Sequence, residues 1–157
     1  MNQKQKLTGK RILIVDDEVD ILEALKELLP MCHVKEAETF EEAERLLHQE
    51  TFDLTILDIM GVRGYELLEI ANKNDVITVM LTANALTPEN LDRSRKGGAA
   101  YFVPKEKISE IETYLTDVLE AQEKGKNLWS RWLERFEDYF DRKFGGDWKE
   151  KHYMSFR

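Results

Sequence analysis

The stretch Leu54-Thr55-Ile56-Leu57-Asp58 decides the fold that this sequence of 157 residues predicts. Its first four residues are apolar or β-branched and leave no polar face, which is typical of a strand covered on both sides in a parallel sheet. The run ends on a carboxylate and then breaks into Ile59-Met60-Gly61. In open α/β sheets, ligands bind at the carboxyl ends of the strands. We therefore expect Asp58 to face a crevice at that end of a sheet.

Three further strand-like runs also end on groups that can take part in chemistry. In chain order, they are 11–15 before Asp16 and Asp17, 76–81 before Thr82, and 100–103 before Pro104 and Lys105. The carboxyl ends of adjacent parallel strands meet at one edge of a sheet. The sequence therefore predicts that three acids, a hydroxyl and an amine form one site.

Segments with helical periodicity alternate with these strands and with a short strand expected over 34–37. The predicted helices cover 18–29, 39–49, a segment from about 64, 87–97 and 107–122. Thr39 and Thr87 are expected as N-caps, with Glu42 completing a capping box and Pro88 in a first turn. Five β–α units of this kind predict an α/β protein with a doubly wound, five-stranded parallel sheet.

The chain continues beyond the fifth unit with an aromatic segment. Large apolar residues recur every four positions over 128–144, which predicts an amphipathic helix. We expect 1–10 to be a disordered lead-in, 11–124 to be one domain, and 125–157 to be a helical extension with a polar tail. The aromatic stripe is expected to pack on the chain's own domain. A homodimer or partner interface through 128–144, or attachment to a membrane surface, are the alternatives.

The composition indicates a cytoplasmic globular protein. The net charge is −8 at pH 7, and this acidic balance disfavours nonspecific binding to nucleic acid. The single cysteine, Cys32, excludes an internal disulfide. No apolar run approaches the roughly 20 residues of a membrane span, and Met1–Lys10 lacks the apolar stretch of a secretory signal.

The acids at the strand ends predict a magnesium site. Close carboxylates repel one another unless a cation or proton intervenes, and Mg²⁺ prefers oxygen ligands. A metal bound at Asp17 and Asp58 leaves positions for a phosphoryl oxygen, near the charge of Lys105 and the hydroxyl of Thr82. Asp58 is the natural nucleophile because a carboxylate can form an acyl phosphate. Taken alone, Asp16 and Asp17 would fit a plain helix cap better than a metal site.

Four motifs at the strand ends resemble the receiver domain of two-component response regulators, which has a flavodoxin-like fold. The motifs are Ile14-Val15-Asp16-Asp17-Glu18, Ile56-Leu57-Asp58, Leu81-Thr82-Ala83 and Gly98-Ala99-Ala100-Tyr101-Phe102-Val103-Pro104-Lys105. The resemblance covers roughly residues 10–122. It implies that Asp58 takes a phosphoryl group from a histidine kinase or phosphotransfer protein. It also implies a phosphoacceptor that acts through an unknown downstream protein target and is not an enzyme with an external substrate.

The resemblance assigns further roles within the predicted receiver domain. It implies that Asp16, Asp17, Asp58 and the backbone carbonyl of Met60 hold Mg²⁺, and that Thr82 and Lys105 bind the phosphoryl group. It also implies that Phe102 is the rotating aromatic residue of the switch, although a buried phenylalanine fits a static core equally well.

Two departures from the family pattern keep an alternative open. The loop 59–64 is shorter than usual, and Pro104 precedes Lys105, so that an X-Pro bond of variable geometry comes directly before the lysine. The alternative is a pseudo-receiver or scaffold that binds partners without phosphorylation. A metal-dependent phosphatase generally needs a second acid where Met60 stands. A flavodoxin needs a hydroxyl- and glycine-rich phosphate loop in place of Asp16 and Asp17.

Overall fold

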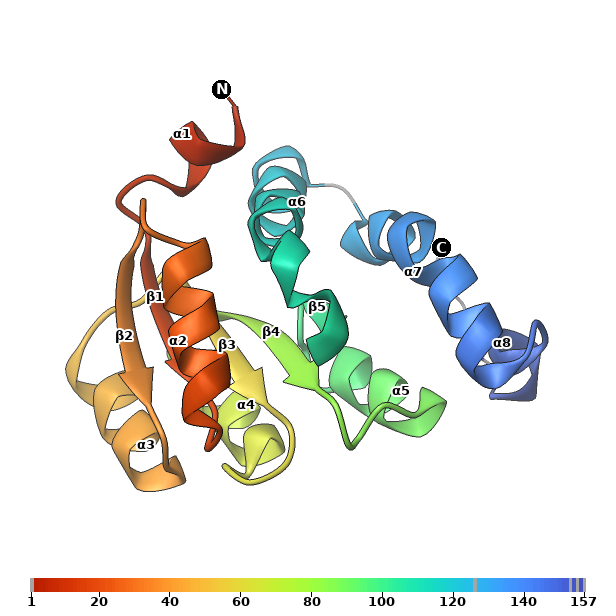
Figure 1. Ribbon diagram of the computed structural model, residues 1–157, viewed down its shortest axis with the longest axis horizontal. Helices are drawn as coiled ribbons and strands as arrows, with labels where there is room; N and C mark the ends of the chain where they lie inside the picture. Colours follow the sequence, from red (N-terminus) through yellow and green to blue (C-terminus); the bar gives the residue numbers. More distant parts are fainter. Residues whose placement is uncertain (1, 126, 153, 155, 157) are drawn as a thin grey trace.

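The computed structural model describes residues 2–125, 127–152, 154 and 156, and its centre is a parallel sheet (Figure 1). The strands are β1 (Arg11–Val15), β2 (His33–Ala37), β3 (Leu54–Asp58), β4 (Ile77–Thr82) and β5 (Tyr101–Pro104). Their order is β2-β1-β3-β4-β5, and every neighbouring pair is parallel. This arrangement confirms the predicted doubly wound sheet with β1 in its interior.

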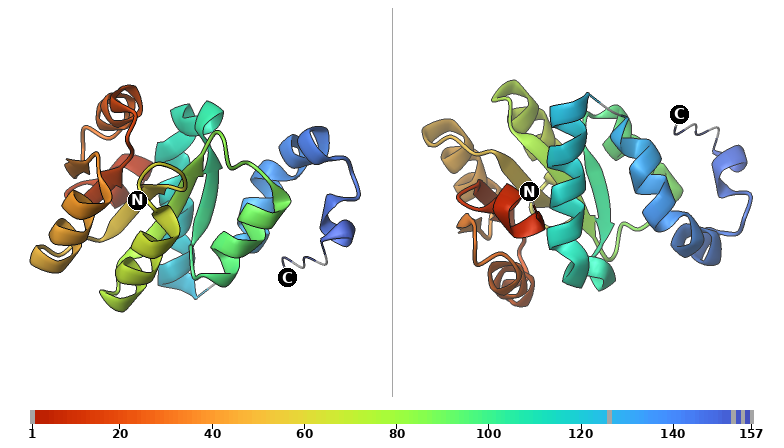
Figure 2. Two further views of the ribbon diagram at one scale, coloured as in Figure 1. Left: turned by 90° about the horizontal axis from the view of Figure 1, so that it is seen from below. Right: turned by 90° about the horizontal axis from the view of Figure 1, so that it is seen from above.

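Helices cover both faces of the sheet. They are α2 (Val19–Leu28), α3 (Phe40–Gln49), α4 (Gly64–Lys73), α5 (Pro88–Lys96) and α6 (Ile111–Lys124). Figures 1 and 2 show α2 and α6 on one face and α3, α4 and α5 on the other. All five residues of β3 are buried between these two layers, which explains why its sequence has no polar face.

Local chemistry sets the helix starts as the sequence predicts. The hydroxyl oxygen of Thr39 accepts a hydrogen bond from Glu42 N at 3.2 Å, and that of Thr87 accepts one from Asn90 N at 3.1 Å. Each bond satisfies an amide that has no partner inside the helix. The start of the last predicted helix differs, because a 3₁₀ helix, η1 (Lys105–Glu110), precedes α6.

The lead-in is ordered in the structure, contrary to the expectation of disorder over 1–10. Residues Gln3–Leu7 form the short helix α1, and Leu7 is completely buried. Lys6 Nζ lies 3.2 Å from a carboxylate oxygen of Glu120 on α6. A five-residue helix with one large apolar side chain is too short for its periodicity to be visible in the sequence.

The aromatic helix α7 (Leu128–Phe144) packs on the chain's own domain, as predicted. It lies beside the edge strand β5 (Figures 1 and 2). Trp132, Phe136 and Phe140 of α7 are buried, and the indole Nε1 of Trp132 donates a 2.7 Å hydrogen bond to the backbone carbonyl of Phe102 in β5. The helix therefore extends the core past the edge of the sheet.

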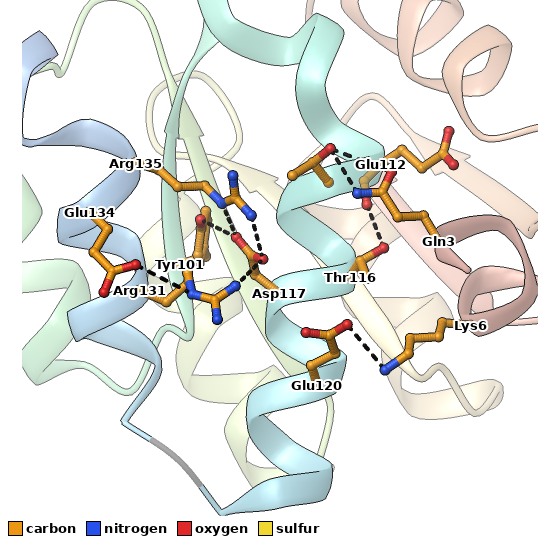
Figure 3. Close-up of polar contacts among 11 residues, drawn as sticks. Gln3, Lys6, Tyr101, Glu112, Thr116, Asp117, Glu120, Arg131, Glu134 and Arg135 are labelled. Carbon is orange, nitrogen blue, oxygen red and sulfur yellow. Dashed lines mark hydrogen bonds and ion pairs between the residues drawn. The ribbon is translucent and has the colours of Figure 1, made fainter. Parts of the chain in front are cut away.

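A buried carboxylate fastens α7 to α6 (Figure 3). Asp117 of α6 is 4% exposed and accepts a 3.0 Å hydrogen bond from the hydroxyl of Tyr101. Arg131 and Arg135 of α7 both pair with the same carboxylate. Because hydrogen bonds surround the charge on several sides, its burial is offset by well-matched partners.

The tail over 147–157 carries Trp148 and Phe156 among its polar residues, and the structure buries both side chains. Trp148–Lys151 forms a helical turn, α8, and the side chain of Trp148 is 1% exposed. Phe156 stacks on Trp132 with ring centroids 5.6 Å apart. Residues 153, 155 and 157 lie outside the described residues. Single aromatic residues in a charged segment gave no periodic signal, although they complete the aromatic core.

Within the described residues, no helix combines the length and the apolar character needed to cross a bilayer.

Candidate functional site

Sheet register brings the predicted site residues to one edge. Val15 pairs with Leu57, so Asp16 and Asp58 are the next residues on neighbouring strands. Asp58 in turn pairs with Leu81, which precedes Thr82. Thr82 pairs with Pro104, so Lys105 comes directly after the end of β5. Four strands therefore contribute to one site because their apolar runs end at matching positions.

The three acids form a compact cluster. One carboxylate oxygen from each of Asp16, Asp17 and Asp58 lies within 4.8 Å of the other two. Asp16 is completely buried and Asp58 is 4% exposed, whereas Asp17 lies at the surface. The cluster is therefore reached from solvent on the side of Asp17.

Lys105 balances part of this negative charge. Its Nζ atom lies 2.8 Å from Asp16 Oδ2, 2.8 Å from Glu18 Oε1 and 3.3 Å from Asp58 Oδ1. The lysine side chain is only 8% exposed, so these ion pairs are poorly screened by solvent. Pro104 does not keep Lys105 from the site, since these ion pairs form directly after it.

Burial and like charges shift the acid equilibria of the cluster. Burial and, after it, the nearby Asp16 carboxylate together raise the pKa of Asp58 to about 7, against the lowering effect of Lys105. Burial also raises the pKa of Asp16, although hydrogen bonds from Lys105 and the Glu18 amide oppose the change. Burial disfavours the charge on Lys105, but its hydrogen bonds to Asp16 and Glu18 outweigh this effect and raise its pKa. The cluster therefore favours added positive charge.

The short loop after Asp58 approaches the cluster closely through two glycines. Gly61 has φ of +86°, and a Cβ atom built on it would lie 2.5 Å from Asp17 Oδ2. A Cβ on Gly64 would lie 2.3 Å from the backbone oxygen of Asp58. Glycine at both positions lets the shortened loop fit against the acids without displacing them.

The remaining predicted site residues are Thr82, Met60 and Phe102, and they differ in burial and in their contacts. Thr82 is buried, and its hydroxyl oxygen accepts a 2.9 Å hydrogen bond from Ala85 N. The side chain of Met60 is 55% exposed beside the loop glycine. Phe102 is completely buried, and its ring centroid lies 6.3 Å from that of Phe140 on α7.

Sequence reasoning missed the part that Glu18 plays. Glu18 belongs to one of the four motifs and stands at the expected start of a helix, but the sequence predicts no ion-pair partner for it. In the structure its carboxylate pairs with Lys105, and its amide donates a 2.9 Å hydrogen bond to Asp16 Oδ1. The available signal was a third consecutive acid, which needs a cation nearby once the first is buried.

The donor set fits a hard divalent cation. All three acids offer oxygen, which is the ligand type that Mg²⁺ selects. Asp16 Oδ2 is buried, and its polar partner among the described residues is the Lys105 ammonium group at 2.8 Å. The exposed edge at Asp17 leaves room for the water ligands that Mg²⁺ usually keeps. These observations identify an acidic cluster suited to Mg²⁺.

Comparison with known proteins gives a consistent result. A family model described as the response regulator receiver domain matches residues 12–116. A probable transcriptional regulator, ycf27, of Guillardia theta is 36% identical over 122 residues, which cover 74% of this chain and 48% of that protein. The chain thus spans about half the length of this relative.

Solved structures show the same fold. The crystal structure of a CheY-like response regulator receiver domain protein from Methanospirillum hungatei is 30% identical, with a TM-score of 0.62 over 73% of this chain and 99% of that one. The BeF₃-activated receiver domain of DrrB, a protein of Thermotoga maritima, is 28% identical, with a TM-score of 0.63 over 72% of this chain and 99% of that one. The family model ends at residue 116, before the C-terminal extension.

Proposed function

The chain belongs to the response regulator receiver domain family, and from this premise we propose that Asp58 accepts a phosphoryl group in a Mg²⁺-dependent two-component relay. The donor is a phosphohistidine of a histidine kinase or phosphotransfer protein. A carboxylate oxygen of Asp58 attacks the phosphorus atom, the P–N bond breaks, and the imidazole leaves with the electron pair and takes up a proton. Water later attacks the same phosphorus atom, the P–O bond to Asp58 breaks, and the carboxylate is regenerated as inorganic phosphate leaves.

The observation that carries the proposal is the convergence of Lys105 and three carboxylates on one edge of the sheet. Asp16, Asp17 and Asp58, with the backbone carbonyl of Met60, would hold Mg²⁺. Bound there, the ion would supply positive charge that keeps Asp58 deprotonated and neutralises charge that develops on the phosphoryl oxygens. The raised pKa of Asp58, about 7, gives such a cation a clear effect at neutral pH.

Lys105 and Thr82 are proposed to bind the transferred group. Lys105 Nζ lies 3.3 Å from Asp58 Oδ1, so its ammonium group can form an ion pair with a phosphoryl group attached to that carboxylate. The oxygen of Thr82 already accepts a hydrogen bond from Ala85 N, which leaves the hydroxyl proton to be donated to a phosphoryl oxygen. Both residues would contribute more to the phosphorylated state than to the free one. Phe102 is proposed as the switch residue that follows their movement.

Incubation of the full chain with Mg²⁺ and acetyl phosphate tests this proposal. We expect a mass gain of one phosphoryl group on intact protein, with the modified peptide containing Asp58. Asp58→Asn should abolish the gain. Asp138→Asn is the matched control, because Asp138 is an exposed acid on α7. A mass gain that persists in Asp58→Asn would refute the assignment of the acceptor.

The alternative of a scaffold that needs no phosphorylation predicts no mass gain with any donor. One of its two supports is weakened, because Lys105 reaches the acids despite Pro104. As a receiver, the chain is proposed to act through a downstream protein target in the cytoplasm and to have neither nucleic-acid binding nor turnover of an external substrate. A homodimer through 128–144 stays a prediction. Trp132, Phe136 and Phe140 are already buried within one chain, so it would have to use other residues of α7.

A further inference from the structure

The three residues that follow β5 connect the acid cluster to the aromatic helix. Lys105 points into the cluster, as described above. Glu106, the next residue, accepts a hydrogen bond from the hydroxyl of Tyr139 and lies 3.5 Å from Nζ of Lys143. Nζ of Lys107 lies 5.4 Å from the centre of the Tyr139 ring. One turn of η1 thus has the phosphoacceptor site on one side and the second half of α7 on the other.

The two halves of α7 are held differently. The first half is fixed by Arg131 and Arg135 on the buried carboxylate of Asp117 (Figure 3). It is also fixed by Trp132, which donates a hydrogen bond to the backbone of β5. The second half packs Phe140 into the aromatic core, with its ring centroid 6.3 Å from that of Phe102, and it contacts η1 through Tyr139 and Lys143 at Glu106. Glu106 is 55% exposed and Lys143 is 46% exposed, so this ion pair is weak. These contacts of the second half with Glu106 are therefore the ones that a movement of η1 can weaken.

The second half of α7 also carries α8. The indole nitrogen of Trp148 donates a 2.9 Å hydrogen bond to Asp141, and its ring lies 5.6 Å from that of Phe140. Release of the helix at Tyr139 would therefore change the surroundings of Trp148. The anchored Trp132 would be much less affected.

We propose that the second half of α7, together with α8, is an intramolecular latch on η1, and that phosphorylation of Asp58 loosens it. This inference rests on the proposed phosphoacceptor function. Without a phosphoryl group, Lys105 pairs with Asp16 and Glu18, while Glu106 accepts a hydrogen bond from Tyr139 of α7. A phosphoryl group on Asp58 draws the ammonium group of Lys105 toward its oxygens. Because Glu106 is the adjacent residue, that shift strains its contacts with Tyr139 and Lys143.

The coupling must act in both directions. If phosphorylation weakens the latch, removal of the latch must favour the phosphorylated state by the same factor. Beryllofluoride with Mg²⁺ serves as the probe because it mimics a phosphoryl group on a carboxylate. We expect Tyr139→Phe and Glu106→Gln to bind beryllofluoride about threefold more tightly than the wild type. Tyr139→Phe removes only the hydroxyl donor, and Glu106 is exposed, so neither change should unfold the domain.

Glu134→Gln is the matched control for these variants. It removes one exposed acid from the same helix, and the described partner of Glu134 is Arg131 at 3.7 Å, away from η1. We expect its affinity for beryllofluoride to equal that of the wild type. An equal gain in this control would assign the effect to net charge and would overturn the latch.

Hydrogen exchange of the full chain measures whether occupation of the phosphoryl site loosens the latch. On addition of Mg²⁺ and beryllofluoride, we expect amide exchange over 137–151 to become several-fold faster, while exchange over 128–135 stays the same. In Tyr139→Phe exchange over 137–151 should be fast before the probe is added. If acetyl phosphate phosphorylates Asp58 but exchange over 137–151 does not change, the latch is refuted and the phosphoacceptor function stands. If Asp58 is not phosphorylated at all, both proposals are refuted.

Discussion

At the scale of single residues, the site places two buried carboxylates side by side, with one lysine to compensate their charge. Asp58 is buried next to Asp16, and Lys105 compensates only part of their charge. An acid in this setting holds its proton to higher pH than in the unfolded chain. The consequence is a stability that depends on pH in the direction opposite to that of an ordinary ion-paired carboxylate.

Asp58→Asn should therefore stabilise the metal-free protein at alkaline pH. The folded pKa of about 7 exceeds the unfolded value, so the folded state binds more protons between these two values and wild-type stability falls as pH rises through that interval. The asparagine side chain does not ionise, so the Asp58→Asn variant does not lose this part of the free energy of unfolding. We expect a gain of about 1–3 kcal/mol at about pH 8 and much less at about pH 5. Urea unfolding in EDTA at both pH values measures it, and an equal gain at both would contradict the assigned pKa.

Gly61→Ala should weaken Mg²⁺ binding more than it weakens the fold. The new methyl group would lie 2.5 Å from Asp17 Oδ2, and the exposed aspartate would have to move away from the other acids. We expect about tenfold weaker Mg²⁺ affinity, which a titration with a competing chelator measures. Gly125→Ala is the control, because Gly125 also has positive φ but a Cβ there meets nothing within 4 Å. Similar Mg²⁺ affinities in the two variants would show that Asp17 is not a ligand.

At the scale of the elements, the aromatic helix satisfies an edge strand that would otherwise be open. Unpaired backbone groups on a sheet edge promote association with other chains. Here Trp132 donates to the carbonyl of Phe102, and Pro104 in the same strand has no amide hydrogen to leave unpaired. The position of Pro104 is thus accounted for by the edge of the sheet and does not disturb Lys105.

Trp132→Phe should measure how much the hydrogen bond between Trp132 and the carbonyl of Phe102 contributes to the free energy of unfolding. The phenyl ring keeps most of the apolar contacts but leaves the buried carbonyl of Phe102 without its indole donor. We expect a loss of about 1–3 kcal/mol in the free energy of unfolding. Trp129→Phe is the comparison, because Trp129 is only partly buried. A loss no greater than that of Trp129→Phe would mean that packing alone holds α7 on β5.

The sequence was sufficient for the elements that repeat and for residues at their ends. Five apolar runs and their caps follow from local rules, and the acids and Lys105 follow from the positions at which strands end. Glu18 and Asp117 could not be assigned, because their partners lie far away along the chain. The short helix Gln3–Leu7 and the burial of Trp148 could not be predicted for one reason: Leu7 and Trp148 are isolated apolar residues whose burial depends on tertiary contacts.

At the scale of the whole molecule, the extension and the domain share one core. Tyr101 and Tyr114 of the domain contact Phe136 of α7, with ring centroids 6.1 and 5.1 Å apart. The tail adds Phe156, whose ring lies 4.1 Å from the guanidinium group of Arg95 on α5. Such continuous packing predicts that the domain and the extension unfold together, even though the latch can open locally.

Two spectroscopic signals can test this shared core without any mutation. All three tryptophans, Trp129, Trp132 and Trp148, lie in the extension, whereas most helix and all of the described strands lie in the domain. Tryptophan fluorescence therefore reports the extension, and far-ultraviolet circular dichroism reports mainly the domain. In urea we expect both signals to give the same midpoint and slope, as a single cooperative transition requires. A fluorescence transition at clearly lower urea would show that 128–152 is a separate unit that docks on a stable receiver domain. In that case a chain ending at Gly125 would keep its full stability, whereas a shared core predicts that this truncation lowers the urea midpoint and exposes the rings of Tyr101 and Tyr114.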